Sequence, residues 1–319
     1  MQATTLQSEY FQLEQVEEGI YVAIVTDGKG AIGNAGIVDL GDRTLVWDTF
    51  QLPQAAADLR RMAEELFERP VSTVINSHFH LDHCGGNQVF ADCDIYATEK
   101  TREMIAERTP RIVEYIRTHP EVLEQAEQQV AAEQDPVERA NLEKQVGNMR
   151  EMGRAVKNGF EVTLPNVIFQ DALTFHGSKH TAHLYCFGGG HTPSDTVMVL
   201  PEDDVLFIGD LVTNGSHPMI RDGSASEWLE MLAKIKELPV QKIIPGHGPV
   251  AGKDLLAVIR RYITHIMNTA QNLVDTGRPI EAIDELPLPD DYADWSIGDL
   301  YHRNLKFRYE WIKAQNGNE

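Results

Sequence analysis

Hydrophobic and polar positions follow two different periods along the chain, and these periods separate strands from helices. In the first hundred residues, short runs rich in Val and Ile predict strands over 20–25, 36–40, 44–48 and 72–76. Residues 53–68, with apolar positions at helical spacing, predict a helix. This order of three strands, a helix and a strand is typical of a layered α/β or α+β domain.

The segment 98–158 has another pattern. It is dense in Glu, Gln, Arg and Ala, its apolar residues recur at helical spacing, and Pro110, Pro120 and Pro136 interrupt it. We expect two to four helices here, inserted between two β-rich halves. Structural packing, a homodimer contact and a cap over an active site are interpretations that the sequence leaves open.

The strand pattern returns after residue 162 and then gives way to helices. Strands are predicted over 167–169, 172–175, 183–187, 196–200, 205–208 and 242–244, and helices over 226–238, 254–276 and 296–314. The last two helices form a C-terminal extension over 254–319. The two β-rich halves, each ending in loops that carry histidine, suggest a duplicated sandwich within a single domain over 1–319.

The charge balance narrows the expected partners. The chain has 28 Lys and Arg against 49 Asp and Glu, a formal net charge of −21. Such a surface repels phosphate backbones and anionic lipid, so we expect neither nucleic acid nor membrane as a partner and predict a small-molecule substrate. The three cysteines form no CxxC motif, and the first residues lack the pattern of a secretory signal. These features predict a reducing, cytoplasmic location.

One motif points to metal chemistry: His78-Phe79-His80-Leu81-Asp82-His83. His78 and His80 are two residues apart directly after a predicted strand, so an extended backbone directs both side chains to the same side. Asp82 and His83 follow where the chain turns toward a pair of glycines. Imidazole and carboxylate groups are common ligands of Zn²⁺, and Mn²⁺ or Fe²⁺ accept the same set.

Three further residues of ligand type follow predicted strands: His191, Asp210 and His247. Each has an ordinary structural explanation when taken alone; an aspartate such as Asp210 often forms a turn or caps a helix. Together with the first motif, they place ligand-type side chains on four loops that each follow a strand. Loops at one edge of a rigid sheet are common positions for functional sites.

The successive sequences HFHLDH, GGGHTPSD, FIGD and PGHG, in this order, resemble the motifs of the metallo-β-lactamase superfamily over about residues 20–250. The resemblance implies a four-layer αββα sandwich with two metals at one sheet edge. It implies that a first metal is bound by His78, His80 and His191. A second metal would be bound by Asp82, His83 and His247, and Asp210 would bridge both.

The resemblance also has an informative departure. β-Lactamases of the commonest subclass carry cysteine where this chain has Asp210, and aspartate there resembles the lactonase, glyoxalase, phosphodiesterase and thioesterase branches. We therefore expect a hydrolase of an ester-type bond (lactone, thioester or carboxylic ester), in which a hydroxide bridging two divalent ions, preferably Zn²⁺, attacks the substrate. Asp82 and Asp210 are the predicted catalytic residues.

Three alternatives to ester hydrolysis remain open. They are hydrolysis of a β-lactam, a persulfide dioxygenase with one iron, and a relative without activity. His217, Tyr301 and His302 are candidate substrate-binding residues, because the first follows the Asp210 loop and the others lie in the aromatic tail. Ordinary surface exposure or helix packing explains the same residues equally simply.

Overall fold

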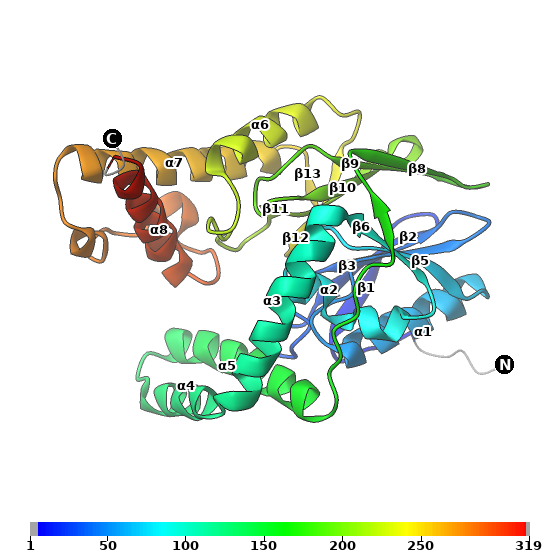
Figure 1. Ribbon diagram of the computed structural model, residues 1–319, viewed down its shortest axis with the longest axis horizontal. Helices are drawn as coiled ribbons and strands as arrows, with labels where there is room; N and C mark the ends of the chain where they lie inside the picture. Colours follow the sequence, from blue (N-terminus) through cyan, green and yellow to red (C-terminus); the bar gives the residue numbers. More distant parts are fainter. Residues whose placement is uncertain (1–5, 317–319) are drawn as a thin grey trace.

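The computed structural model of the chain describes residues 6–316 and contains two β-sheets (Figure 1). The first sheet has seven strands in the order of the sequence. Its neighbours are antiparallel from β1 to β4 and parallel from β4 to β7. The strands are β1 (Phe11–Glu17), β2 (Ile20–Val25), β3 (Ala35–Asp39), β4 (Thr44–Trp47), β5 (Val71–Ile75), β6 (Asp94–Thr98) and β7 (Val167–Phe169).

The second sheet has six strands in the order β13-β12-β11-β10-β9-β8. All neighbours are antiparallel except β11 and β12. The strands are β8 (Ala172–His176), β9 (Thr181–Cys186), β10 (Thr196–Leu200), β11 (Val205–Thr213), β12 (Lys242–His247) and β13 (Ala251–Gly252).

Apolar side chains from both sheets meet in a shared core, in which Val38 and Leu45 of the first sheet pack with Leu184 and Phe207 of the second. Helices cover the outer faces of both sheets. The first sheet packs against α1 (Pro53–Phe67) and the second against α6 (Ala225–Lys236) and α7 (Leu255–Asp275). The predicted order of helix, sheet, sheet and helix is therefore confirmed.

Three helices occupy residues 99–157, between β6 and β7: α3 (Glu99–Thr118), α4 (Glu121–Ala132) and α5 (Pro136–Lys157). They lie on the same side of the sandwich as the C-terminal helix α8 (Asp299–Asn316) (Figure 1). Pro120 and Pro136 mark helix boundaries, as predicted. The prediction that Pro110 also ends a helix is wrong, since α3 continues through it. Pro110 is exposed, so its ring lies on the outer side of the helix, and the residue removes one intrahelical hydrogen bond.

The structure also contains strands that the sequence pattern did not reveal. The sequence of β1 looks polar because only some residues, such as Phe11 and Leu13, are apolar. This pattern suits an edge strand with one face exposed to solvent. β6 is short and was not predicted. The sequence pattern predicts a strand over 205–208 that ends before Asp210, whereas β11 extends to Thr213 with shifts in its register against β12. No helix within residues 6–316 is long and apolar enough to cross a membrane.

Candidate metal centre

Both sheets contribute loops to one edge of the sandwich, where the candidate ligands gather. His78 and His80 lie on the loop after β5, and Asp82 and His83 lie on the short helix α2 (Leu81–Cys84) that follows it. The second half of the chain supplies the other three residues. They are His191 in the loop between β9 and β10, Asp210 within β11, and His247 at the end of β12.

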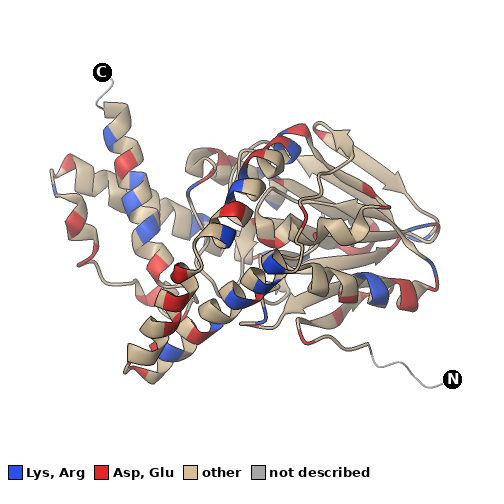
Figure 2. Ribbon diagram, turned by 60° about the horizontal axis from the view of Figure 1, so that its bottom comes forward, with Lys and Arg blue, Asp and Glu red and all other residues tan. Residues whose placement is uncertain are grey.

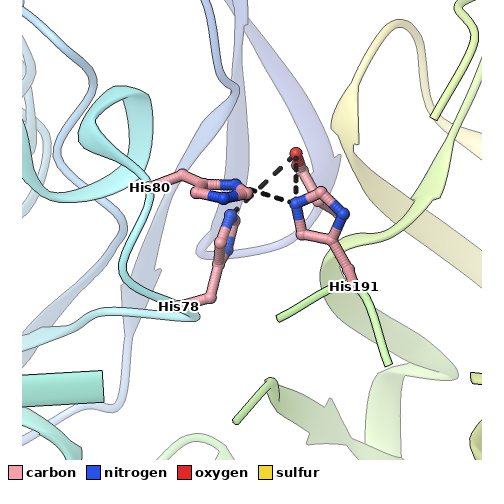
Figure 3. Close-up of side chains that lie close together, drawn as sticks. His78, His80 and His191 are labelled. Atoms are coloured by element: carbon pink, nitrogen blue, oxygen red, sulfur yellow. Dashed lines mark hydrogen bonds and ion pairs between the residues drawn. The ribbon is translucent and has the colours of Figure 1, made fainter. Parts of the chain in front are cut away.

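The first group consists of His78, His80, His191 and Asp210, which each offer one ligand atom within 4.8 Å of the others. Figure 3 shows the three histidine rings pointing toward one another from the two halves of the chain. The Nε2 atom of His191 lies 2.9 Å from Nδ1 of His80 and 3.4 Å from a carboxylate oxygen of Asp210. Three imidazoles and a carboxylate are a suitable set of ligands for one divalent ion.

The second group consists of Asp82, His83 and His247, whose ligand atoms meet the same distance limit. Asp210 lies beside this group as well. Its Oδ1 atom is 3.1 Å from Nε2 of His83, and its Oδ2 atom is 3.1 Å from Nε2 of His247. One carboxylate therefore faces both groups, with a different oxygen toward His83 than toward His191.

The unsatisfied atoms at this point fit a cation. His78 Nε2, His83 Nε2 and Asp210 Oδ1 are buried and have no hydrogen-bond partner among the described residues. Buried polar atoms without partners are costly, and they are rare in folded proteins. Divalent metal ions at the two groups would satisfy them, so the residues present fit the expected metals.

The outer nitrogen of several histidines is held by the protein. His83 donates from Nδ1 to Asp48, and His191 donates from Nδ1 to the backbone carbonyl of Met219, at 2.9 and 3.1 Å. His78 Nδ1 lies 2.9 Å from the hydroxyl of Ser77. Because these contacts occupy Nδ1, they leave Nε2 of each ring to face the centre. Such outer contacts fix the tautomer and orientation of metal-binding histidines.

His80 is oriented in the opposite sense. Its Nε2 atom lies 3.1 Å from a carboxylate oxygen of Asp222, so Nδ1 is the atom that faces His191. The side chain of Asp222 is only 8% exposed. Although burial favours the neutral acid, the contact with His80 and the nearby arginines lower the pKa of Asp222 to about 2. The carboxylate therefore stays ionised and holds the ring.

Two glycines give the centre its space. A Cβ atom on Gly246 would lie 1.9 Å from Oδ1 of Asp210, so a side chain at this position would displace the carboxylate. Gly209 has φ of +56° and approaches Ser77, where a Cβ would lie 3.1 Å from that side chain. Steric crowding thus explains why glycine precedes Asp210 and His247 in the two motifs.

The carboxylates of the candidate metal centre make it attractive to positive charge. Burial opposes protonation of His83 and His247, but the carboxylates of Asp210 and Asp82 outweigh it and raise the pKa of both rings. Burial and the neighbouring histidines instead lower the pKa of His191 to about 3, in spite of Asp210. Part of the centre thus attracts a cation, and a neutral imidazole is available to bind it.

A cleft of about 950 Å³ opens onto the candidate ligands. Its walls include α3, α5 and the segments around residues 213–222 and 296–300. His217 lines it, yet the residue is only 2% exposed and its Nδ1 lies 3.0 Å from the hydroxyl of Tyr262. Of the other candidate substrate residues, Tyr301 pairs with His265 and His302 donates to a backbone carbonyl. The structure does not bring these two to the cleft walls that it describes.

Sequence reasoning missed the residues that support the ligands. Asp48 carried a usable signal, because an acidic residue directly after the apolar strand β4 resembles Asp210 after the apolar part of β11. Asp222 carried no comparable signal. It lies in a loop between β11 and α6, and only the folded chain brings it to His80.

Fold and centre together define a metal-binding αββα sandwich. A sequence model of the Metallo-beta-lactamase superfamily matches residues 28–247. Because this match covers more than half of the chain, the protein belongs to that superfamily, whose members are metal-dependent hydrolases.

Individual relatives agree with this assignment. The chain is 30% identical over 120 residues to the Beta-lactamase-like protein 2 homolog of Caenorhabditis elegans, covering 37% of this chain and 40% of that protein. It is 29% identical over 109 residues to Metallo-beta-lactamase type 2 of Bacteroides fragilis, covering 31% and 44%. The matches thus span less than half of these relatives. The structure of a metallo-beta-lactamase from Pontibacter korlensis has a TM-score of 0.59 at 17% identity, covering 80% of this chain and 99% of that one, which supports the fold.

Proposed function

We propose that the protein is a dimetal hydrolase that holds two Zn²⁺ ions and cleaves an ester-type bond in a lactone, thioester or carboxylic ester. The observation that carries this proposal is the position of Asp210 between the two ligand groups. Its Oδ1 faces His83 at 3.1 Å and its Oδ2 faces His191 at 3.4 Å. A carboxylate that faces two groups of imidazoles is suited to bridging two ions, and the nitrogen and oxygen donors suit zinc.

Such ions, when bound, lower the pKa of water and polarise the carbonyl oxygen of a substrate. Side chains of the protein would orient the nucleophilic water. Asp82 lies 3.3 Å from both His83 and His247, and although burial opposes its ionisation, those rings lower the pKa of Asp82 to about 2. It is therefore an ionised acceptor that can orient a nucleophilic water. The cleft admits a substrate of moderate size to this point.

The presence of Asp210, in place of the cysteine of the commonest β-lactamase subclass, favours esters over β-lactams. The two groups also favour hydrolysis over a persulfide dioxygenase, which needs a single iron. A panel containing 4-nitrophenyl acetate, a γ-lactone, a thioester, a β-lactam and glutathione persulfide tests this choice. We expect cleavage of at least one ester-type substrate that chelation abolishes and Zn²⁺ restores. Oxygen consumption on the persulfide with one iron per chain, or ester cleavage that survives chelation, would overturn the proposal.

A further inference from the structure

Basic side chains are concentrated around the cleft although the chain is acidic. Over the whole sequence, 28 basic residues face 49 acidic ones, and Figure 2 shows the two kinds interspersed over the helices. The cleft is instead lined by four of each: Arg108, Arg111, Lys144 and Arg221 against Asp27, Asp82, Asp210 and Asp222. Two of these acidic residues, Asp82 and Asp210, belong to the candidate metal centre. Divalent cations there would offset their charge and leave the cleft attractive to anions.

Two of the arginines converge beside the centre. An Nη2 atom of Arg108 lies 4.0 Å from one carboxylate oxygen of Asp222, and an Nη2 atom of Arg221 lies 3.6 Å from the other. The remaining contact of that carboxylate is with His80, at 3.1 Å. Two guanidinium groups thus face one carboxylate, only one imidazole ring away from the metal centre, and one positive charge is left over.

These two arginines pair with Asp222 only at ion-pair distances, and their hydrogen-bond donors remain free within the described residues. Neither guanidinium group donates a hydrogen bond to any residue within 6–316, and their side chains are 42% and 52% exposed. By contrast, Arg60 donates to both oxygens of Asp92, at 2.6 and 2.8 Å. A planar guanidinium offers several donors in a fixed arrangement that matches a carboxylate. Arg108 and Arg221 therefore have free capacity for an anion that enters the cleft.

An apolar wall continues from this point. Arg108, Ile112 and Tyr115 follow one another at intervals of four and three residues, which places them on the same face of α3. Ile112 and Tyr115 are 42% and 52% exposed, and Ile297, at 43%, lines the same cleft. Large exposed apolar side chains that share a cleft favour an apolar or aromatic ligand.

We propose that Arg108 and Arg221 form an anion subsite that binds a carboxylate of the substrate, while Ile112 and Tyr115 contact its apolar or aromatic part. The substrate class is thus an ester that carries a compact anion close to the scissile bond. The inference rests on the proposed function for the identity of that bond, but not for the binding of the anion.

A matched pair of esters tests the subsite in the Zn²⁺-loaded protein: 4-acetoxybenzoate, which is anionic, and its neutral methyl ester. The variant Arg108→Gln, alone and with Arg221→Gln, is compared with Arg117→Gln, whose arginine lies on α3 but does not line the cleft. We expect the ratio of kcat/KM for the anionic ester to that for the neutral ester to fall about tenfold or more in the double variant, the value of a charge-assisted hydrogen bond. It should stay within about twofold of wild type in Arg117→Gln.

Binding of benzoate and of neutral benzamide, measured by calorimetry, keeps this test independent of hydrolysis. We expect the double variant to weaken benzoate binding about tenfold or more and to leave the weaker benzamide binding in place. If neither ester is cleaved but benzoate binding depends on the two arginines, the ester function fails and the subsite stands. The subsite is overturned if the double variant loses kcat/KM equally for both esters and binds benzoate as well as wild type does. It is also overturned if the wild-type protein does not bind benzoate more tightly than benzamide.

Discussion

The Oδ2 atom of Asp48 lies 2.9 Å from Nδ1 of His83, and both side chains are wholly buried. The same carboxylate oxygen accepts a hydrogen bond from the hydroxyl of Ser77, and that hydroxyl contacts Nδ1 of His78. One buried carboxylate therefore orients a histidine from each of the two candidate ligand groups. This chain of contacts links the two ligand groups of the centre through the protein itself.

Replacement of Asp48 by Asn should lower the affinity for metal about 10- to 100-fold, because the outer carboxylate sets the orientation and basicity of the ligand. Asn tolerates the left-handed backbone at this position, where φ is +55°, so the fold should be retained. Titration of Zn²⁺ in competition with a chelator measures the effect. Asp39→Asn is the control, since the side chain of Asp39 is also buried but pairs with Arg69 and Lys179. Equal metal affinity in the two variants would contradict the role of Asp48.

Gly246→Ala should weaken metal binding by about tenfold or more. Its Cβ would lie 1.9 Å from Oδ1 of Asp210, and the carboxylate has to move to relieve the contact. Gly252→Ala on the neighbouring strand is the matched control, because a Cβ there meets nothing within 4 Å. The metal retained after dialysis against a chelator gradient reports the difference. A Gly246→Ala protein that retains metal as well as the Gly252→Ala protein would show that Asp210 is not confined in this way.

His217 makes stability depend on pH. Burial lowers the pKa of this ring to about 4, from an ordinary value of 6.5. The folded chain therefore binds fewer protons at His217 than the unfolded chain, and its stability falls as the pH decreases from about 6.5 toward 4. Between pH 7 and 4.5, the metal-free wild type should lose at least about 1 kcal/mol more free energy of unfolding than His217→Gln. Urea denaturation at both pH values measures this, and the other titrating groups cancel between the proteins. Equal losses would show that His217 is not held neutral.

The sequence predicted the sandwich and the candidate ligands because their signals are local. Runs such as residues 205–208 are buried on both faces and therefore continuously apolar, and ligand-type residues follow such strands directly. Asp222 and Asp48 instead support the centre through contacts between distant segments. Residues 108 and 222 meet only because α3 packs beside the loop after β11, and no spacing in the chain encodes this.

The C-terminal tail shows how helix orientation limits a prediction from sequence. Tyr301 and His302 form a polar and aromatic cluster in the sequence, which makes them candidates for contact with substrate. In the structure, their polar atoms pair with His265 and with the carbonyl of Leu286, while Leu300 reaches the cleft. Leu300 and Tyr301 are adjacent on α8 and therefore point in different directions, and the sequence pattern alone does not say which of the two faces the cleft.

Metal stoichiometry tests the central claim most directly. After reconstitution with Zn²⁺ and removal of unbound Zn²⁺, inductively coupled plasma mass spectrometry should find two zinc ions per wild-type chain. It should find one in His191→Ala, which breaks the first group, and one in His247→Ala, which breaks the second. Asp210→Ala should lose metal from both groups. A wild-type protein with one ion or none, or a His191→Ala protein that keeps two, would contradict a centre in which Asp210 joins two groups.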